Sequence, residues 1–169
     1  MKKIFLLLLV SSFILFVNAQ TTTKADSIPL PAYKRLPDVP AFTITLVSDS
    51  SIFAKENLKK KTKALIILFS PDCSHCEHAT KQILAKIDSF KNTQIIMVSN
   101  LSYDLVRKFY DKYKIADYPT IEMGVDKNYF LGSFYKLTSF PTIFLYNKKG
   151  KFKATYSASN TISDIIADL

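Results

Sequence analysis

The sequence predicts an α/β fold in which a mixed β-sheet is covered by helices on both faces. An unbroken apolar run at 64–69 (ALIILF) has the length of a central strand that is buried on both sides. Segments with helical spacing alternate with further strand-like segments, which is typical of parallel crossovers. Two more strands, expected at 142–146 and 152–156, are separated by a short turn and indicate a hairpin at one edge.

Residues 1–19 are expected to be a signal peptide. Lys2 and Lys3 precede an apolar run, Ile4 to Val17, and small residues lead to a cleavage point after Ala19. The run is shorter than the roughly 20 residues that cross a bilayer, so cleavage is favoured over a retained membrane anchor. We therefore expect a periplasmic or otherwise exported protein. If the segment is not cleaved, it alone would contact the membrane.

Residues 20–38 are polar and rich in proline, which is typical of a linker or of a strap over a domain surface. The folded domain is expected to occupy residues 39–169, a length that can bury a core without cross-links. Its first strand is expected at 42–46, where apolar residues alternate with threonines, and the buried strand at 64–69 follows.

A helix is expected from Ser74 to about Phe90, followed by a strand at 94–99. Ser102 can cap a second helix, which leads to a short strand at 119–123. The apolar residues that share one face of the first helix are Cys76, Ala79, Ile83, Ile87 and Phe90.

Asp126 is expected to open a third helix. The aromatic residues expected to face inward from that helix are Tyr129, Phe130 and Phe134. The hairpin turn at 147–150 ends with a glycine, where a left-handed residue is wanted, and a polar cap at 160–161 opens the last helix.

The formal net charge of +9 becomes +7 if Lys2 and Lys3 leave with the signal peptide. Eight of the other 19 lysines lie in two short clusters, at 59–63 and 148–153. No recognition motif for nucleic acid accompanies them, and an exported protein seldom meets such a partner. We interpret these clusters as solvated turns and expect no nucleic-acid partner.

Cys73 and Cys76 are the only cysteines of the chain, and they lie at the predicted start of the helix after the buried strand. The unpaired N–H groups and the dipole of that helix start are expected to stabilise a thiolate at Cys73. Cys76 lies one turn further along, on the apolar face, and is expected to be shielded. This spacing predicts that Cys73 attacks a disulfide and that Cys76 resolves the mixed disulfide.

Two neighbouring side chains are expected to tune this chemistry. An imidazole at His75 would stabilise the thiolate and the reduced form, which favours stronger oxidising power. A carboxylate at Asp72 would oppose the thiolate, unless it caps the helix instead. The direction of electron flow, reductase or oxidase, depends on which side chain dominates.

A copper or zinc site is the first alternative, because His75 and His78 lie beside the two cysteines. Four ligands within six residues of one helix start do not easily surround a tetrahedral ion, so no metal and no cofactor are expected. A non-catalytic metal-binding or chaperone module remains an open alternative. A structural disulfide is disfavoured, because closing so small a loop stabilises little.

With the cysteine pair after a buried strand and Phe140-Pro141-Thr142 before another, the chain resembles the thioredoxin-like superfamily. More closely it resembles the exported TlpA/ResA-type thiol-disulfide oxidoreductases, which are grouped with the AhpC/TSA redoxins. The resemblance covers residues 39–169 and implies a central helix-strand insertion at 102–123. It also implies a cis Pro141 beside the cysteines, and Phe140 and Pro141 as the substrate-binding residues. The implied partners are protein thiols or disulfides and a redox partner protein.

Several residues depart from the family pattern. Asp72 replaces the tryptophan that commonly precedes the first cysteine, and Ile67 replaces the buried aspartate of thioredoxins. A base for Cys76 would then be water or another carboxylate, with Glu77 and Glu122 as candidates. His75 before the second cysteine resembles oxidising enzymes.

A peroxiredoxin-like peroxidase is a further alternative, because Ser70 stands three residues before Cys73, as in peroxiredoxins. Ile66 stands where the proline of that family is expected, and the paired cysteine does not fit its arrangement. Peroxidase activity is therefore a minor alternative.

Overall fold

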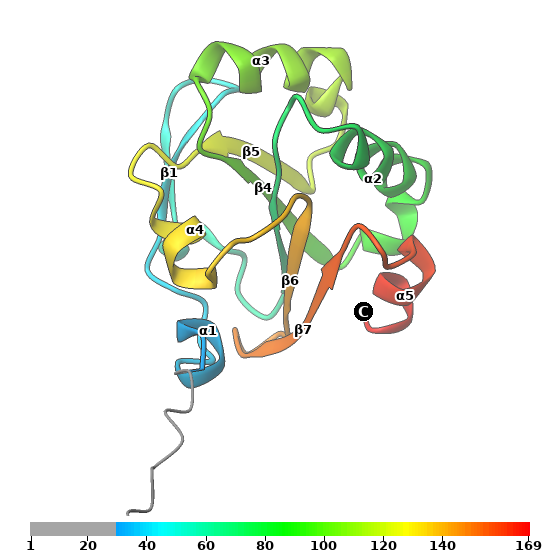
Figure 1. Cartoon of the computed structure of the whole chain (residues 1–169). Helices are drawn as coiled ribbons and strands as arrows, with labels where there is room; N and C mark the ends of the chain where they lie inside the picture. Colours follow the sequence, from blue (N-terminus) through cyan, green and yellow to red (C-terminus); the bar gives the residue numbers. More distant parts are fainter. Residues whose placement is uncertain (1–29) are drawn as a thin grey trace, which may run out of the picture.

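The computed structural model describes residues 30–169, in which helices cover both faces of a seven-stranded sheet (Figure 1). The expected signal peptide and residues 20–29 of the expected linker lie outside the described residues. In chain order the elements are α1 (Ala32–Arg35), β1 (Thr43–Leu46), β2 (Ile52–Ala54), β3 (Lys63–Leu68), α2 (Ser74–Ala85), β4 (Thr93–Ser99), α3 (Tyr103–Lys112), β5 (Ile121–Val125), α4 (Phe130–Tyr135), β6 (Thr142–Tyr146), β7 (Phe152–Ser157) and α5 (Ile162–Ala167).

The sheet is mixed, as the sequence predicts. Its strands lie in the order β2-β1-β5-β4-β3-β6-β7. β3, β4 and β5 are parallel, because α2 and α3 return the chain between them, whereas β6 runs antiparallel to β3 and forms the predicted hairpin with β7. β3 therefore lies inside the sheet, and Leu65, Ile66 and Ile67 along it are at most 2 % exposed.

Successive residues of the central strands enter two different cores. Leu65 and Ile67 point to the face that is covered by α2, α3 and α5. Ile66 and Leu68 point to the other face, covered by α1 and α4, where six of the buried side chains are aromatic. The helix residues buried in the first core are Cys76, Ile83, Val106, Phe109 and Ile165, and those in the second are Tyr33, Leu131 and Tyr135.

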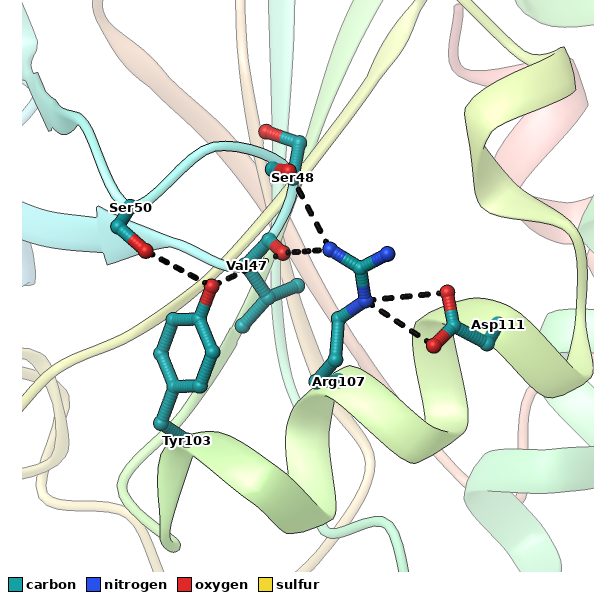
Figure 2. A network of polar contacts seen from close by, with 6 residues as sticks. All are labelled: Val47, Ser48, Ser50, Tyr103, Arg107 and Asp111. Carbon is teal, nitrogen blue, oxygen red and sulfur yellow. Dashed lines mark hydrogen bonds and ion pairs between the residues drawn. The ribbon is translucent and has the colours of Figure 1, made fainter.

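The expected helix-strand insertion is formed by α3 and β5, and β5 lies between β1 and β4. Figure 2 shows how α3 is tied to the turn after β1. Arg107 Nη1 donates to the carbonyl oxygens of Val47 (2.7 Å) and Ser48 (3.2 Å), and the Tyr103 hydroxyl donates to that of Val47 (3.1 Å). Arg107 Nε also donates to both carboxylate oxygens of Asp111, which lies one helical turn further along α3. Two side chains of α3 thus share one carbonyl acceptor in the turn.

The start of α4 differs from the sequence prediction. Asp126 Oδ2 accepts the N–H of Leu131 at 2.7 Å, and the helix begins only at Phe130. The prediction that Tyr129 and Phe130 face inward is wrong, because each side chain is 40 % exposed. Leu131 and Tyr135 occupy the inward positions instead. The later start of the helix rotates a different stripe of residues toward the core.

Two boundaries and one additional strand also differ from the prediction. α2 ends at Ala85, and a separate 3-10 turn at Ile87–Phe90 carries Phe90 into the core. β5 begins at Ile121, two residues later than expected, since Pro119 has no N–H to donate to the sheet. β2 was not predicted, because its three residues are too few to show a pattern.

Residues 30–38 pack against the domain. Tyr33 in α1 is buried, and its ring centroid lies 5.7, 5.3 and 5.0 Å from those of Tyr135, Phe144 and Phe152. The carbonyl oxygen of Pro37 accepts the N–H of Phe152 at the start of β7. Among the helices of residues 30–169, none has the length and apolarity needed to cross a membrane.

Candidate active site

Cys73 lies where the chain passes from β3 into α2. β3 ends at Leu68, and the Cys73 N–H donates to the carbonyl oxygen of Ser70 at 3.2 Å in the turn that follows. Cys73 occupies the N-cap position of α2 with an extended backbone, at φ −104° and ψ 115°. Its side chain therefore lies beside the free N–H groups of the first helical turn.

Two backbone groups contact the half-buried sulfur of Cys73. The N–H of Cys76 donates to Cys73 Sγ at 3.3 Å, and Sγ lies 3.7 Å from the carbonyl oxygen of Phe140, to which the thiol can donate. The first contact strengthens when the sulfur is ionised, whereas the second requires a proton on the sulfur. The site can therefore hold Cys73 as a thiolate or as a thiol.

Cys76 is shielded, with 1 % of its surface exposed. Burial, followed by the hydrogen bond with Cys73, raises the pKa of the Cys76 thiol to about 12. The Cys76 carbonyl oxygen accepts the Thr80 hydroxyl at 2.8 Å. Sequence analysis did not single out Thr80, although its position four residues after Cys76 on a helix is the signal for such a bond. Both cysteines are free thiols.

Phe140, which precedes Pro141, contacts Cys73 across 67 residues of sequence. β6 starts directly after Pro141 and pairs antiparallel with β3, so that Thr142 lies opposite Leu68. This register brings the loop before β6 to the same end of the sheet as Cys73. The peptide bond between Phe140 and Pro141 is cis, as the family resemblance implies.

His75 and Asp72 are both exposed. Among the described residues, neither side chain forms a hydrogen bond to the Cys73 sulfur, whose partners are the backbone groups of Cys76 and Phe140. His75 instead faces a hollow between α2, α5 and the start of β6, with a cavity volume of about 40 Å³. The residues around it include His75, His78, Pro141, Ile143, Asn160 and Ile165.

The candidate carboxylates for Cys76 lie elsewhere. Glu77 forms an ion pair with Lys112 of α3 at 2.6 Å, and the hydrogen bond to this lysine lowers the Glu77 pKa. Glu122 lies on β5, whose adjoining residues face the core of Cys76, so its own side chain lies on the other face of the sheet. Ile67, which packs in the same core as Cys76, is apolar. Neither carboxylate is placed to accept a proton from Cys76.

Residues 30–169 contain no group of three or more cysteine, histidine, aspartate or glutamate side chains that could hold a metal ion. His75 and His78 line one side of the hollow, and Cys76 is buried in the core. The four side chains considered for a metal site thus divide between the surface and the interior.

The chain belongs to the thioredoxin-like domain family, whose family model matches residues 53–168. This span includes both cysteines and Pro141. No curated protein matches the chain.

Several solved structures share the fold. A secreted disulfide oxidoreductase of Mycobacterium tuberculosis, homologous to E. coli DsbE, is 16% identical over 80% of this chain and 98% of that chain, with a TM-score of 0.64. StoA from Bacillus subtilis is 21% identical over 78% and 98%, with a TM-score of 0.60. The exposed lipoprotein thioredoxin Etrx1 of Streptococcus pneumoniae is 20% identical over 77% and 100%, with a TM-score of 0.59. These likenesses show a thioredoxin-like fold.

Proposed function

We propose that this protein is an exported thiol-disulfide oxidoreductase of the TlpA/ResA type, with Cys73 as the nucleophile and Cys76 as the resolving cysteine. The observation that carries the proposal is the pairing of a half-buried sulfur at a helix start with a shielded sulfur one turn further along. Membership of the thioredoxin-like family supports it. So does a neighbour of the same fold that is described as a disulfide oxidoreductase.

In the first step, the Cys73 thiolate attacks one sulfur of a client disulfide. A bond forms between Cys73 Sγ and that sulfur, the client disulfide breaks, and the second client sulfur leaves as a thiolate that takes a proton from water. The N–H of Cys76, 3.3 Å from Cys73 Sγ, stabilises the attacking thiolate beforehand.

In the second step, Cys76 loses its proton and attacks Cys73 Sγ. The bond between Cys73 and the client breaks, the client leaves with both sulfurs reduced, and the two cysteines hold a disulfide. Two electrons have then passed to the client, and a redox partner protein would return them. The same steps in reverse oxidise a client, so the reduction potential decides the direction.

Phe140 and Pro141 are proposed to bind the client beside the reacting sulfur. The contact between Cys73 Sγ and the Phe140 carbonyl oxygen supports this role, since a client chain lying along Phe140 would meet the thiol directly. The hollow next to His75 would receive a client side chain near the reacting cysteine.

Export is supported by the basic start and apolar run of residues 1–19. A neighbour of the same fold is described as secreted, and another as exposed. An oxidising compartment would give the cysteine pair disulfides to exchange.

Trapping the intermediate tests the proposal. Cys76→Ser should accumulate a mixed disulfide with a disulfide-bonded model peptide, because the second step is blocked, and a reducing agent should release it. Cys73→Ser is the matched control and should trap nothing. The proposal fails if the Cys76→Ser variant traps no peptide and the wild type exchanges with no model substrate.

A further inference from the structure

Lysines from three separate turns gather at one end of the sheet. The turns precede β3, precede β4 and follow β6, and they are adjacent because Lys63 pairs with Thr93 and Ala64 pairs with Tyr146. Two neighbouring surface hollows at this end are lined by seven lysines, which we call the basic end: Lys55, Lys59, Lys60, Lys61, Lys63, Lys91 and Lys148. The sequence shows these lysines as short clusters, whereas the fold combines them into one surface.

Little negative charge balances the basic end. No carboxylate lines either hollow, and none of the seven lysines forms an ion pair within residues 30–169. Asp38 is paired with Lys151, and Glu56 is exposed beside Lys55 in the sequence. Lys59 lowers the pKa of the half-buried Glu122, although burial raises it more. Like charges that are held together repel one another, so an anionic partner would stabilise this surface.

Exposed apolar side chains flank the short helix α1, which shortly precedes Val39, a lining residue of one of the two hollows. Leu30 and Leu36, at the two ends of α1, are 58 % and 60 % exposed. Val39 N donates to the Gly150 carbonyl oxygen, which places the segment that follows α1 beside the hairpin turn that carries Lys148. In Figure 1, α1 lies at the same end of the molecule as the turn between β6 and β7. Basic and apolar side chains on one surface are typical of proteins that lie on a membrane.

The basic end is opposite the cysteines. Lys63 begins β3 and Leu68 ends it, so the two ends of the sheet are separated by the length of this six-residue strand, roughly 20 Å. Cys73 follows beyond the far end. A surface bound at the basic end would therefore leave the Cys73 sulfur facing away from it.

We propose that the basic end docks on the surface of an anionic phospholipid bilayer, with the lysines on lipid phosphates and Leu30 and Leu36 at the boundary of the acyl chains. Neither hollow has an aromatic lining residue on which a base could stack, which disfavours nucleic acid as the partner. Docked in this way, the protein presents Cys73 to clients on the side away from the membrane.

Chemical footprinting of the full chain tests the contact. Lysines are acetylated in the presence of vesicles of mixed phosphatidylglycerol and phosphatidylcholine, or of phosphatidylcholine alone, and located by mass spectrometry. Lys59, Lys60 and Lys148 should react about tenfold more slowly on the anionic vesicles only, and high salt should remove the protection. The exposed Lys108 and Lys127 are internal references. Equal protection on both vesicles, or none, overturns the proposal, because the apolar N-terminal run would bind either kind.

Charge removal gives a second test with a matched control. The triple variant Lys59→Gln, Lys60→Gln, Lys61→Gln should bind anionic vesicles on the order of 100-fold more weakly at low salt. The control, with Lys81, Lys108 and Lys127 changed to Gln, removes the same charge from exposed positions on other elements and should bind as the wild type does. An equal loss in both triples overturns docking at this end. The wild type could instead bind a single-stranded oligonucleotide more tightly than the anionic vesicles, and the Lys59, Lys60 and Lys61 variant could lose that binding. This result would overturn the proposed lipid partner in favour of nucleic acid.

Discussion

The backbone N–H of Cys76 points at the sulfur of Cys73 across 3.3 Å. The resolving cysteine therefore supports the attacking one through its main chain, while its own side chain is 1 % exposed in the core. A substitution of the Cys76 side chain leaves this hydrogen bond in place. The two sulfurs thus differ in environment within one helical turn: Cys73 Sγ accepts a backbone N–H at the half-buried helix start, whereas burial disfavours a charge on Cys76.

Brief alkylation of the reduced protein should distinguish the two thiols. Iodoacetamide reacts with thiolates, and a pKa of about 12 leaves almost no thiolate at Cys76 near neutral pH. We expect Cys73 to react at least about 100-fold faster. Mass spectrometry of the two labelled forms measures this ratio, and comparable rates at both sulfurs would contradict the assignment of roles.

The same thiol has a consequence for stability at alkaline pH. Folding raises the pKa of Cys76, so its burial stabilises the fold fully below the ordinary thiol pKa, and this contribution is lost as the pH rises toward about 12. The stability of the wild type should therefore fall more steeply above the ordinary thiol pKa than that of Cys76→Ala. Denaturant unfolding at several pH values measures both slopes, and parallel curves would show that Cys76 is not shielded.

Replacement of His75 by proline should make the cysteine pair more reducing. The imidazole lies in the first turn of α2, where a positive charge on the ring would favour the thiolate and hence the reduced form. Because His75 is exposed and its imidazole forms no hydrogen bond with Cys73 among the described residues, we expect a negative shift of only about 30 mV. A glutathione titration measures the potential.

His78→Ala is the matched control for that titration, since His78 lines the same hollow one turn further along and should leave the potential unchanged. An unchanged or less negative potential in His75→Pro would show that His75 is not the tuning group. The reduction potential of the wild type also indicates the direction of electron flow. A potential near roughly −270 mV indicates a reductase, and one near about −120 mV indicates an oxidase.

The elements that the sequence predicts correctly have local causes. The run at 64–69 is apolar throughout because β3 is covered on both faces, and Gly150, at φ 71°, closes the predicted hairpin turn. Thr161 caps α5 through the N–H of Asp164. These features depend on neighbouring residues, so a pattern in the sequence is sufficient to find them.

The features that the sequence leaves out depend on contacts between distant residues. Cys73 contacts Phe140 only because β6 pairs with β3, and the basic end forms only because three turns lie together at one end of the sheet. Such long-range pairing leaves no periodic signal in the sequence. The face that α4 presents has a local cause instead, the hydrogen bond from the Leu131 N–H to Asp126, because the helix begins later than the residues expected to open it.

The shared carbonyl of Val47 should make two substitutions in α3 non-additive. Tyr103→Phe and Arg107→Ala each leave the other donor on the Val47 oxygen and should each cost about 1 kcal/mol of unfolding free energy. The double variant leaves that acceptor without either side chain, and we expect a further loss of about 1 kcal/mol beyond the sum. Denaturant unfolding of the four proteins measures this coupling, and strict additivity would refute the shared anchor seen in Figure 2.

An acidic residue at position 67 should accelerate the release of a client. Ile67 packs in the same core as Cys76, and neither Glu77 nor Glu122 is placed to take the Cys76 proton. In the wild type water or hydroxide is then the base, and because burial raises the pKa of Cys76, the rate at which a trapped peptide leaves Cys73 should rise steadily with pH above neutrality. Ile67→Asp should add a base inside the core and give faster release near neutral pH, with a flatter dependence on pH.

Ile67→Asn is the control for that experiment, because it buries a side chain of the same size that cannot accept the proton. Both variants bury a polar group in an apolar core and should lose roughly 2–5 kcal/mol of stability, so each is first shown to be folded by circular dichroism. The two variants are then alike in packing and differ in the base alone. If release from Ile67→Asp is no faster than from Ile67→Asn, proton removal from Cys76 does not limit the second step.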